Sequence, residues 1–385
     1  MVGTIGVYSC FSTSYSYSDE GANAMEMRAG FEAYLQKIHR RLHNEEDILT
    51  SCLPSKPNKA FTDSADRRYK NMTTTGNMEP IFIAANLHNS EKTLPNMIAQ
   101  LLALADTLGH RRIFVSIYEN GSNDQTKEIL RRFNATLDAL SIAHRIIADE
   151  APRPEHVHRI EYMAKLRNLA LEPLHSSDTQ FGRVVFINDV YFCLSHLLEL
   201  VFQSQIQKAH LTCGEDYDLW KGRPGFHDNW VTRDMGGNMP WKDIHWSIDY
   251  DKSLVPQKRE RPFQVQCCWN GIAVFDAQVF QGDDGIRFRR SAEGECSASE
   301  CSLMCNDMWR KGFGRIAMVP RVKLAHGIKV RDMIRKPSYF PVDVPFADPA
   351  REKITFLPGP EKVFCRPLNG IDTHHPDGPG DYVPV

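Results

Sequence analysis

The chain has 385 residues, of which 42% are apolar and 24% are charged, and its formal net charge is −2. This composition is typical of a folded globular protein and excludes a disordered chain. The near-neutral charge gives no general attraction to nucleic acid, so no nucleic-acid partner is expected. No run of about 18 apolar residues predicts a transmembrane helix, and the first twenty residues do not resemble a signal peptide.

Residues 1–78 are predicted to form a helical extension. Apolar side chains recur at helical spacing over residues 19–49, which predicts an amphipathic helix. Residues 54–80 are polar and predict a linker.

Beyond residue 80, short apolar runs alternate with amphipathic segments. The apolar runs predict strands over residues 81–86, 112–119, 143–149 and 183–189, separated by helices over residues 90–109, 122–140 and 159–176. This alternation predicts an α/β fold with a mostly parallel central sheet and helices on both faces. Ligands of such sheets bind beyond the carboxyl ends of the strands.

The part of the chain after residue 210 is predicted to be irregular at first, because Trp, Gly and Asp are frequent there. A strand over 264–280, a helix over 298–313 and a strand over 315–326 follow. The main domain is predicted to cover residues 79–335, and a Pro-rich tail, 336–385, is predicted to pack on it. The glycine motif of dinucleotide-binding folds and the P-loop are absent, so neither a dinucleotide oxidoreductase nor a P-loop kinase is supported.

Ten cysteines raise the question of metal or disulfides. Only Cys301 and Cys305 have a spacing seen in zinc sites, and no second pair follows, so zinc is not expected. Two interpretations remain open. Disulfides could join Cys296, Cys301 or Cys305 to Cys213, Cys267 or Cys268, as in secreted proteins, or the thiols could simply be buried.

Polar residues follow each predicted strand of the first half. Because parallel strands end at one edge of a sheet, these side chains are expected to converge on one site. The side chains concerned, with those of the third helix, are Asn86, His88, Asn89, Glu91, Glu119, Asn120, Ser122, Asp124, Lys165, Arg167, Asn168, Asn188 and Asp189.

Asp189 directly follows an apolar strand. A carboxylate at such a strand end suits Mg²⁺ or Mn²⁺, whose remaining ligands come from water and phosphate oxygens. Taken alone, Asp189 is better explained as a turn residue or as the N-cap of a helix over 194–207 than as a metal ligand.

The segment Ser299–His326 adds a second pattern. Glu300 opens a helix, Gly312 and Phe313 end it, and His326 closes the following strand. This order resembles the C-terminal part of the catalytic domain of GT-A glycosyltransferases. The wider chain is similar to the fungal capsule-associated α-1,3-mannosyltransferases, glycosyltransferase family 69. The matching segments are 82–95, 115–126, 163–174, 184–192, 213–220, 269–277 and 299–309.

The resemblance implies a GT-A-like enzyme that transfers mannose from GDP-mannose to a mannoside in α-1,3 linkage with retention of configuration. It implies Mn²⁺ (or Mg²⁺) as the cofactor. It also implies a location in the Golgi lumen or secretory pathway, with a membrane anchor that this chain lacks. A cytoplasmic location is the alternative. Asn188-Asp189-Val190 stands where the family fold usually carries an Asp-x-Asp metal motif, so one carboxylate is retained.

The resemblance also implies roles for single residues. Asp189 and His326 would hold the metal, and Glu300 and Asp189 would be catalytic. Glu300 could act as a nucleophile, stabilise the positive charge at the reacting carbon or position the acceptor. Residues expected to bind the donor are Asn86, Glu119, Asn120, Lys165, Arg167, Asn168 and Asn188. Residues expected at the sugar or acceptor are Asp216, Asp218, Trp269, Asn270 and Gly271.

Two other function classes remain open. The chain could bind a nucleotide sugar or carbohydrate without catalysis, because the metal motif is incomplete. It could also be a metal-dependent hydrolase that uses Asp189, Asp216 and His326.

Overall fold

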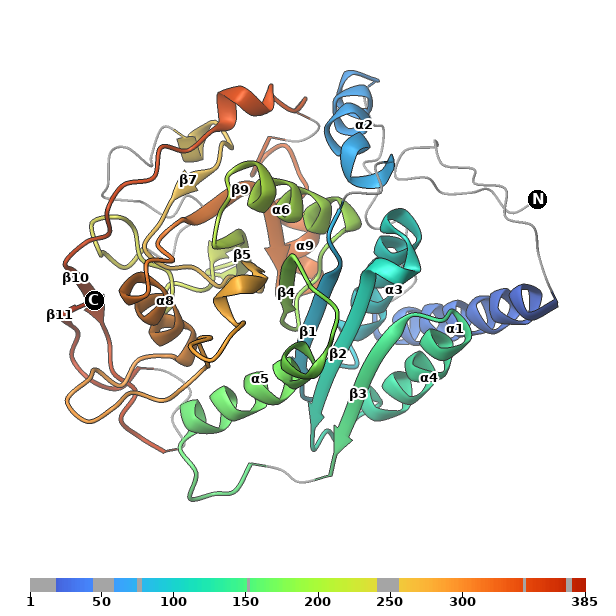
Figure 1. The fold of residues 1–385 in the computed structure, drawn as a ribbon, viewed down its shortest axis with the longest axis horizontal. Helices are drawn as coiled ribbons and strands as arrows, with labels where there is room; N and C mark the ends of the chain where they lie inside the picture. The colour runs from blue at the N-terminus through green and yellow to red at the C-terminus, as the bar shows by residue number, and fades with distance from the viewer. Residues whose placement is uncertain are drawn as a thin grey trace.

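A large mixed sheet forms the centre of the protein in this computed structural model (Figure 1). The structure describes residues 19–43, 59–74, 78–150, 153–240, 256–341, 344–371 and 376–385. The strands lie in the order β3-β2-β1-β4-β8-β5-β9-β7, and β6 pairs with β5 at the side. Strands β1 to β4 are parallel, whereas β8 runs antiparallel to both of its neighbours.

The first half of the chain alternates strands and helices as the sequence predicts. Its strands are β1 (Ile81–Leu87), β2 (Ile113–Asn120), β3 (Ala143–Asp149) and β4 (Arg183–Ile187). Its helices are α1 (Asp19–His43), α2 (Lys59–Thr74), α3 (Leu94–Leu108), α4 (Thr126–Ala139), α5 (Arg159–Ser176) and α6 (Leu194–Ile206).

The second half completes the sheet and adds shorter elements. Its strands are β5 (Leu211–Trp220), β6 (Arg223–Phe226), β7 (Phe263–Gln264), β8 (Ile272–Asp276), β9 (Ile316–Ala325), β10 (Lys362–Cys365) and β11 (Asp381–Pro384). Its helices are α8 (Glu300–Arg310) and α9 (Ile328–Ile334). The last two strands form a separate hairpin.

Two apolar clusters cover the two faces of the sheet. Helices α1, α2, α3, α4 and α6 bury their apolar side chains on one face, and α5, α8 and α9 bury theirs on the other. The predicted class, a mostly parallel central sheet with helices on both faces and a helical N-terminal extension, is therefore confirmed. No helix of the described ranges is long and apolar enough to span a bilayer.

Three local predictions were wrong. The predicted linker contains α2, whose Ala65, Tyr69 and Met72 are buried. The region after residue 210 begins with the long strand β5, which tolerates acidic residues because hydrogen bonds satisfy them, as for Glu215 and the Tyr217 hydroxyl. The predicted strand 264–280 is instead β7 and β8 with a loop between them.

Disulfides hold that loop. Cys213 of β5 bonds to Cys268, and the adjacent Cys267 bonds to Cys305 of α8. The second of these bonds is among the predicted pairings. Cys296 instead bonds to Cys365 of the C-terminal hairpin, and Cys301 is a buried free thiol.

A buried ionic network joins the N-terminal extension to the C-terminal tail. The Arg68 guanidinium donates two hydrogen bonds of 2.7 Å to the carboxylate of Glu199 on α6. It donates a third, of 2.6 Å, to Glu352, and the Tyr69 hydroxyl donates to Glu199. These acids are acceptable in the interior because Arg68 shares its positive charge between them, and Tyr69 and Gln203 donate further hydrogen bonds to them.

Arg68→Ala should therefore lower the free energy of unfolding by about 3–5 kcal/mol, because it leaves two buried carboxylates without their cation. Denaturant unfolding measures this loss. The matched control is Arg28→Ala, which breaks a more exposed pair with Asp106 and should cost about 1 kcal/mol or less. Equal losses for the two variants would contradict the structural role of the network.

Candidate functional site

The carboxyl end of β4 lies against the loop before β8. The Asn188 amide donates a 2.8 Å hydrogen bond to the carbonyl of Gly271. Gly271 has a φ of +80°, and a Cβ there would lie 2.8 Å from a methyl group of Val190. The close approach requires glycine and fixes the backbone on both sides of Asp189, whose side chain is exposed.

Arg167 of α5 brings Glu300 to this strand end. Its Nε donates to Glu300 Oε1 at 2.9 Å, and its Nη1 lies 3.4 Å from Asn188 Oδ1. Arg167 and Glu300 are each only 4% exposed. Arg167 is thus paired with Glu300. The sequence analysis had instead predicted that Arg167 binds the donor.

The carboxylate of Glu300 has further local partners at the start of α8. The Ser299 hydroxyl caps the helix by accepting from the Cys301 amide and lies 3.3 Å from Glu300 Oε2. The Cys301 thiol donates to Oε1 at 3.6 Å, and burial raises the pKa of this thiol well above its ordinary value. Both oxygens of Glu300 are therefore held.

An aromatic cluster surrounds Arg167. Its guanidinium lies 4.3 Å from the ring of Trp269 and 5.0 Å from that of Phe186, distances typical of cation–π contacts. Trp269 is 3% exposed, so its ring packs in the core and cannot stack on a sugar as expected. Its Nε1 is buried and has no hydrogen-bond partner among the residues that the structure describes.

A carboxylate–imidazole pair joins the middle of β5 to the residue that follows β9. His326 Nε2 is 2.9 Å from Asp216 Oδ2, and Asp216 is 1% exposed. Burial disfavours both charges, but the hydrogen bond and mutual attraction lower the pKa of Asp216 and raise that of His326. The charge of Asp189 also raises the pKa of His326, and a backbone bridge between Tyr191 and Ala325 joins the chain segments that carry these two residues.

Two residues of this site, His227 and Asp228, are not predicted from the sequence. The His227 ring lies 3.9 Å from that of His326, and Asp228 Oδ2 accepts a hydrogen bond from the Asn270 amide. Burial and the charge of Asp216 raise the pKa of Asp228 to about 7. The only sequence signal for these two site residues is their position as a His-Asp pair between the aromatic residues Phe226 and Trp230.

The predicted nucleotide side lies at the ends of β1 and β2. Glu119 is fully buried, and its Oε1 accepts from the Ser122 amide. Glu119 Oε2 and Asn86 Oδ1 have no hydrogen-bond partner within the described ranges. The carbonyl of Asn120, on the same strand, is 2.7 Å from His88 Nδ1. Two buried acceptors on neighbouring strands thus remain for a ligand that donates hydrogen bonds.

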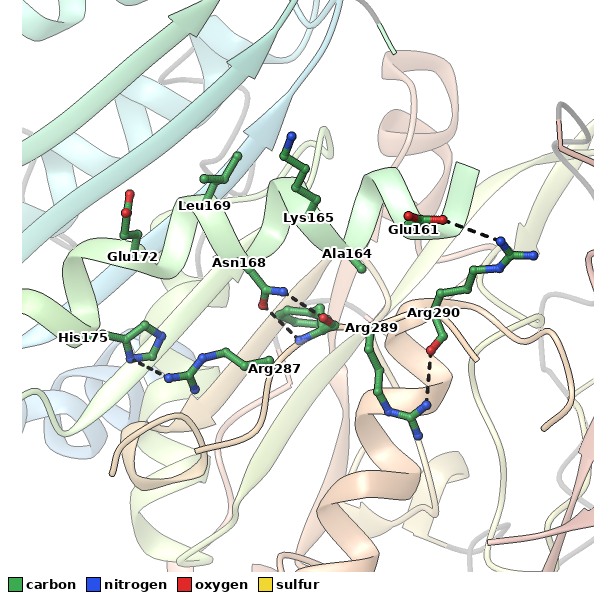
Figure 2. Close-up of a pocket in the computed structure, with 11 residues that line it drawn as sticks. Glu161, Ala164, Lys165, Asn168, Leu169, Glu172, His175, Arg287, Arg289 and Arg290 are labelled. Atoms are coloured by element: carbon green, nitrogen blue, oxygen red, sulfur yellow. Dashed lines mark hydrogen bonds and ion pairs between the residues drawn. The ribbon is translucent and has the colours of Figure 1, made fainter. Parts of the chain in front are cut away.

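Lys165 and Asn168 lie apart from Arg167. They line a cavity of about 470 Å³ between α5 and residues 287–290 (Figure 2). Asn168 exchanges two hydrogen bonds with the backbone of Phe288, and Lys165 points away from Arg289 and Arg290. No hydrogen bond or ion pair among the described residues joins these two side chains to the Arg167–Glu300 pair, although the ring of Phe288 lies 5.7 Å from the Arg167 guanidinium.

The remaining predicted residues have mainly structural contacts. The Asn270 side chain donates to the carbonyl of Gly214 and accepts from Thr232, so its amide is engaged within the fold. Asp218 is at the outer end of β5, with Oδ2 3.8 Å from His227 Nδ1. Asp216, predicted in a loop, is instead a buried strand residue.

A metal at this site would need ligands from the donor. Within the described ranges, no three or more His, Cys, Asp or Glu side chains are grouped so that they alone could bind a metal ion. Asp189 and His326 could supply two ligands. Asp216 already holds one imidazole nitrogen of His326, which is how metal-binding histidines are commonly oriented. The residues therefore fit a cation whose coordination is completed by phosphate oxygens and water.

Asp228→Asn should stabilise the folded protein more at pH 8 than at pH 5. The folded-state pKa, about 7, lies above the unfolded value of about 3.9, so the wild type loses stability as the pH rises between these values. Urea unfolding at both pH values tests this. Asp283→Asn, at an exposed position, is the control and should give no pH-dependent gain. An equal effect of Asp228→Asn at the two pH values would contradict the assignment.

Sequence comparison identifies relatives of the chain. Residues 80–307 match the family described as cryptococcal mannosyltransferase 1. The α-1,3-mannosyltransferase CMT1 of Cryptococcus neoformans var. neoformans serotype D is 33% identical over 329 residues, which are 76% of this chain and 69% of that protein.

Similar solved structures are more distant. Residues 1–349 of Staphylococcus aureus TarS are 16% identical, with a TM-score of 0.36 over 64% of this chain and 60% of that one. The mannosyltransferase PcManGT of Pyrobaculum calidifontis, in complex with GDP-Man and Mn²⁺, is 11% identical, with a TM-score of 0.35 over 80% and 70%. With a family match over more than half of its length and a relative of 33% identity, the chain belongs to the fungal capsule-associated mannosyltransferases, enzymes that transfer mannose.

Proposed function

We propose that the chain transfers mannose from GDP-mannose to a mannoside acceptor in α-1,3 linkage with retention of configuration. The observation that carries this proposal is the contact of Arg167 with both Glu300 and Asn188, the neighbour of Asp189. It joins a buried carboxylate to the strand end where a diphosphate would bind. Family membership supports mannose as the transferred sugar.

The donor nucleoside would bind at the ends of β1 and β2. Guanine presents N–H groups, and the buried acceptors Glu119 Oε2 and Asn86 Oδ1 are suited to receive them. A buried acceptor without a partner costs free energy, which a guanine would recover on binding. This site would also discriminate against bases without matching donors.

The diphosphate would lie between Asp189 and His326. A bound Mn²⁺ or Mg²⁺ would neutralise the charge of the leaving diphosphate. Asp216 would keep the His326 ring oriented, and the exposed Asp189 side chain is free to reach toward the phosphates.

Glu300 would act on the positive charge that develops at the reacting carbon. Its oxygens are held by Arg167, Cys301 and Ser299, and such a carboxylate is better suited to electrostatic stabilisation than to attack as a nucleophile. Asp228 is half-buried beside the Asp216–His326 pair and would contact an acceptor hydroxyl.

The secretory pathway, with the Golgi lumen as the working compartment, is the proposed location. Three disulfides among the described residues support it, because such bonds form and persist in oxidising compartments.

The direct test incubates the protein with GDP-mannose, Mn²⁺ and an α-mannoside and analyses the product by mass spectrometry and NMR linkage analysis. An α-1,3-linked mannosyl product is expected. Binding of GDP-mannose without product would favour a non-catalytic binding protein, and free mannose without transfer would favour a hydrolase.

Asp189→Ala should lower transfer by about 100-fold or more, since it removes a charge that anchors the metal–diphosphate unit. Its melting temperature should stay that of the wild type because Asp189 is exposed. The control Asp283→Ala removes an exposed carboxylate elsewhere and should keep full activity. Full activity of Asp189→Ala would refute the assignment of Asp189.

A further inference from the structure

We propose that Tyr191 is a positioning residue through which helix α1 and the loop after β1 hold Asp189 and His326 beside each other. This inference rests on the proposed function of those two residues at the donor diphosphate. It gives the N-terminal helix a part in catalysis, which nothing in the sequence indicates.

The backbone of Tyr191 sets the spacing of the two side chains. Its amide donates to the carbonyl of Ala325 at 2.8 Å, and the Ala325 amide donates back at 3.2 Å. Tyr191 lies two residues after Asp189, and Ala325 lies directly before His326. A shift of this bridge would therefore move the two predicted ligands relative to each other.

The side chain of Tyr191 connects this bridge to two distant segments. The ring is 3% exposed, and its hydroxyl donates to the carbonyl of Lys92 at 2.9 Å. The same hydroxyl lies 3.1 Å from Nε2 of His43, in the last turn of α1. His43 Nε2 is also 3.1 Å from the Lys92 carbonyl, so the three groups form one closed set of polar contacts.

Lys92 belongs to the loop that follows the predicted nucleoside residues. The loop leaves β1 just after Asn86, and its His88 contacts the carbonyl of Asn120. The Tyr191 hydroxyl thus links the nucleoside side of the site to the diphosphate side. Both sides must be correctly spaced to bind one nucleotide.

Helix α1 does not need Tyr191 in order to dock. In the first half of α1, Arg28 makes two 2.7 Å hydrogen bonds to Asp106 of α3, and at its middle Phe31 stacks on Phe133 of α4 at 6.1 Å. A phenylalanine would fill the buried space at position 191 equally well. The hydroxyl is therefore better explained by the geometry of the site than by attachment of the helix.

The test compares Tyr191→Phe and His43→Ala with the control Arg28→Ala, which weakens the docking of α1 in the first half of the helix, away from His43. The two site variants should lower kcat by about tenfold, because small displacements of reacting groups cost large factors in rate. They should also weaken GDP binding in the presence of Mn²⁺ several-fold by calorimetry. Arg28→Ala should lower the melting temperature and leave kcat and GDP affinity unchanged.

The double variant Tyr191→Phe/His43→Ala should be no worse than the more affected single variant, since both changes remove one shared set of contacts. Wild-type kcat and GDP affinity in Tyr191→Phe, or fully additive losses in the double variant, would overturn the inference. Failure of the wild type to transfer mannose would instead refute the proposed function, and the calorimetric comparison would still decide the role of Tyr191.

Discussion

The site depends on one constraint: a guanidinium buried among aromatic rings must keep its carboxylate partner. Arg167 is 4% exposed, lies over Trp269 and pairs with Glu300. Removing either charge would leave the other in a low-dielectric interior, at a cost of several kcal/mol. The pair therefore fixes α5 against α8, and the contact of Arg167 with Asn188 extends this constraint to the end of β4.

Pairing of buried charges also stabilises the part of the site around Asp216 and His326. Asp216 in the middle of β5 and His326 just after β9 satisfy each other, and the Asp228 amide donates a hydrogen bond to Asp216. Tyr191 ties this part of the site to α1 and to the loop after β1. The N-terminal extension and the C-terminal tail meet in the Arg68 network. Segments from both ends of the chain therefore pack around the sheet that carries the candidate site.

Sequence reasoning predicted what local periodicity determines. The first four strands, their order of alternation with helices and the position of Asp189 just beyond β4 follow from apolar patterns of a few residues. The partner of Arg167 is 133 residues away and could not be read from any local pattern. Asp228 was missed because the surrounding Gly, Trp and Asp residues resemble an irregular loop, and Trp269 was misplaced because core and sugar-binding tryptophans look alike in sequence.

A crystal structure with GDP and Mn²⁺ bound would show whether the nucleotide occupies this site. We expect the guanine beside Glu119 and Asn86, and the diphosphate between Asp189 and His326 with the cation on both. A nucleotide bound elsewhere, for example in the cavity between α5 and residues 287–290, or a diphosphate remote from Asp189 and His326, would contradict this expectation.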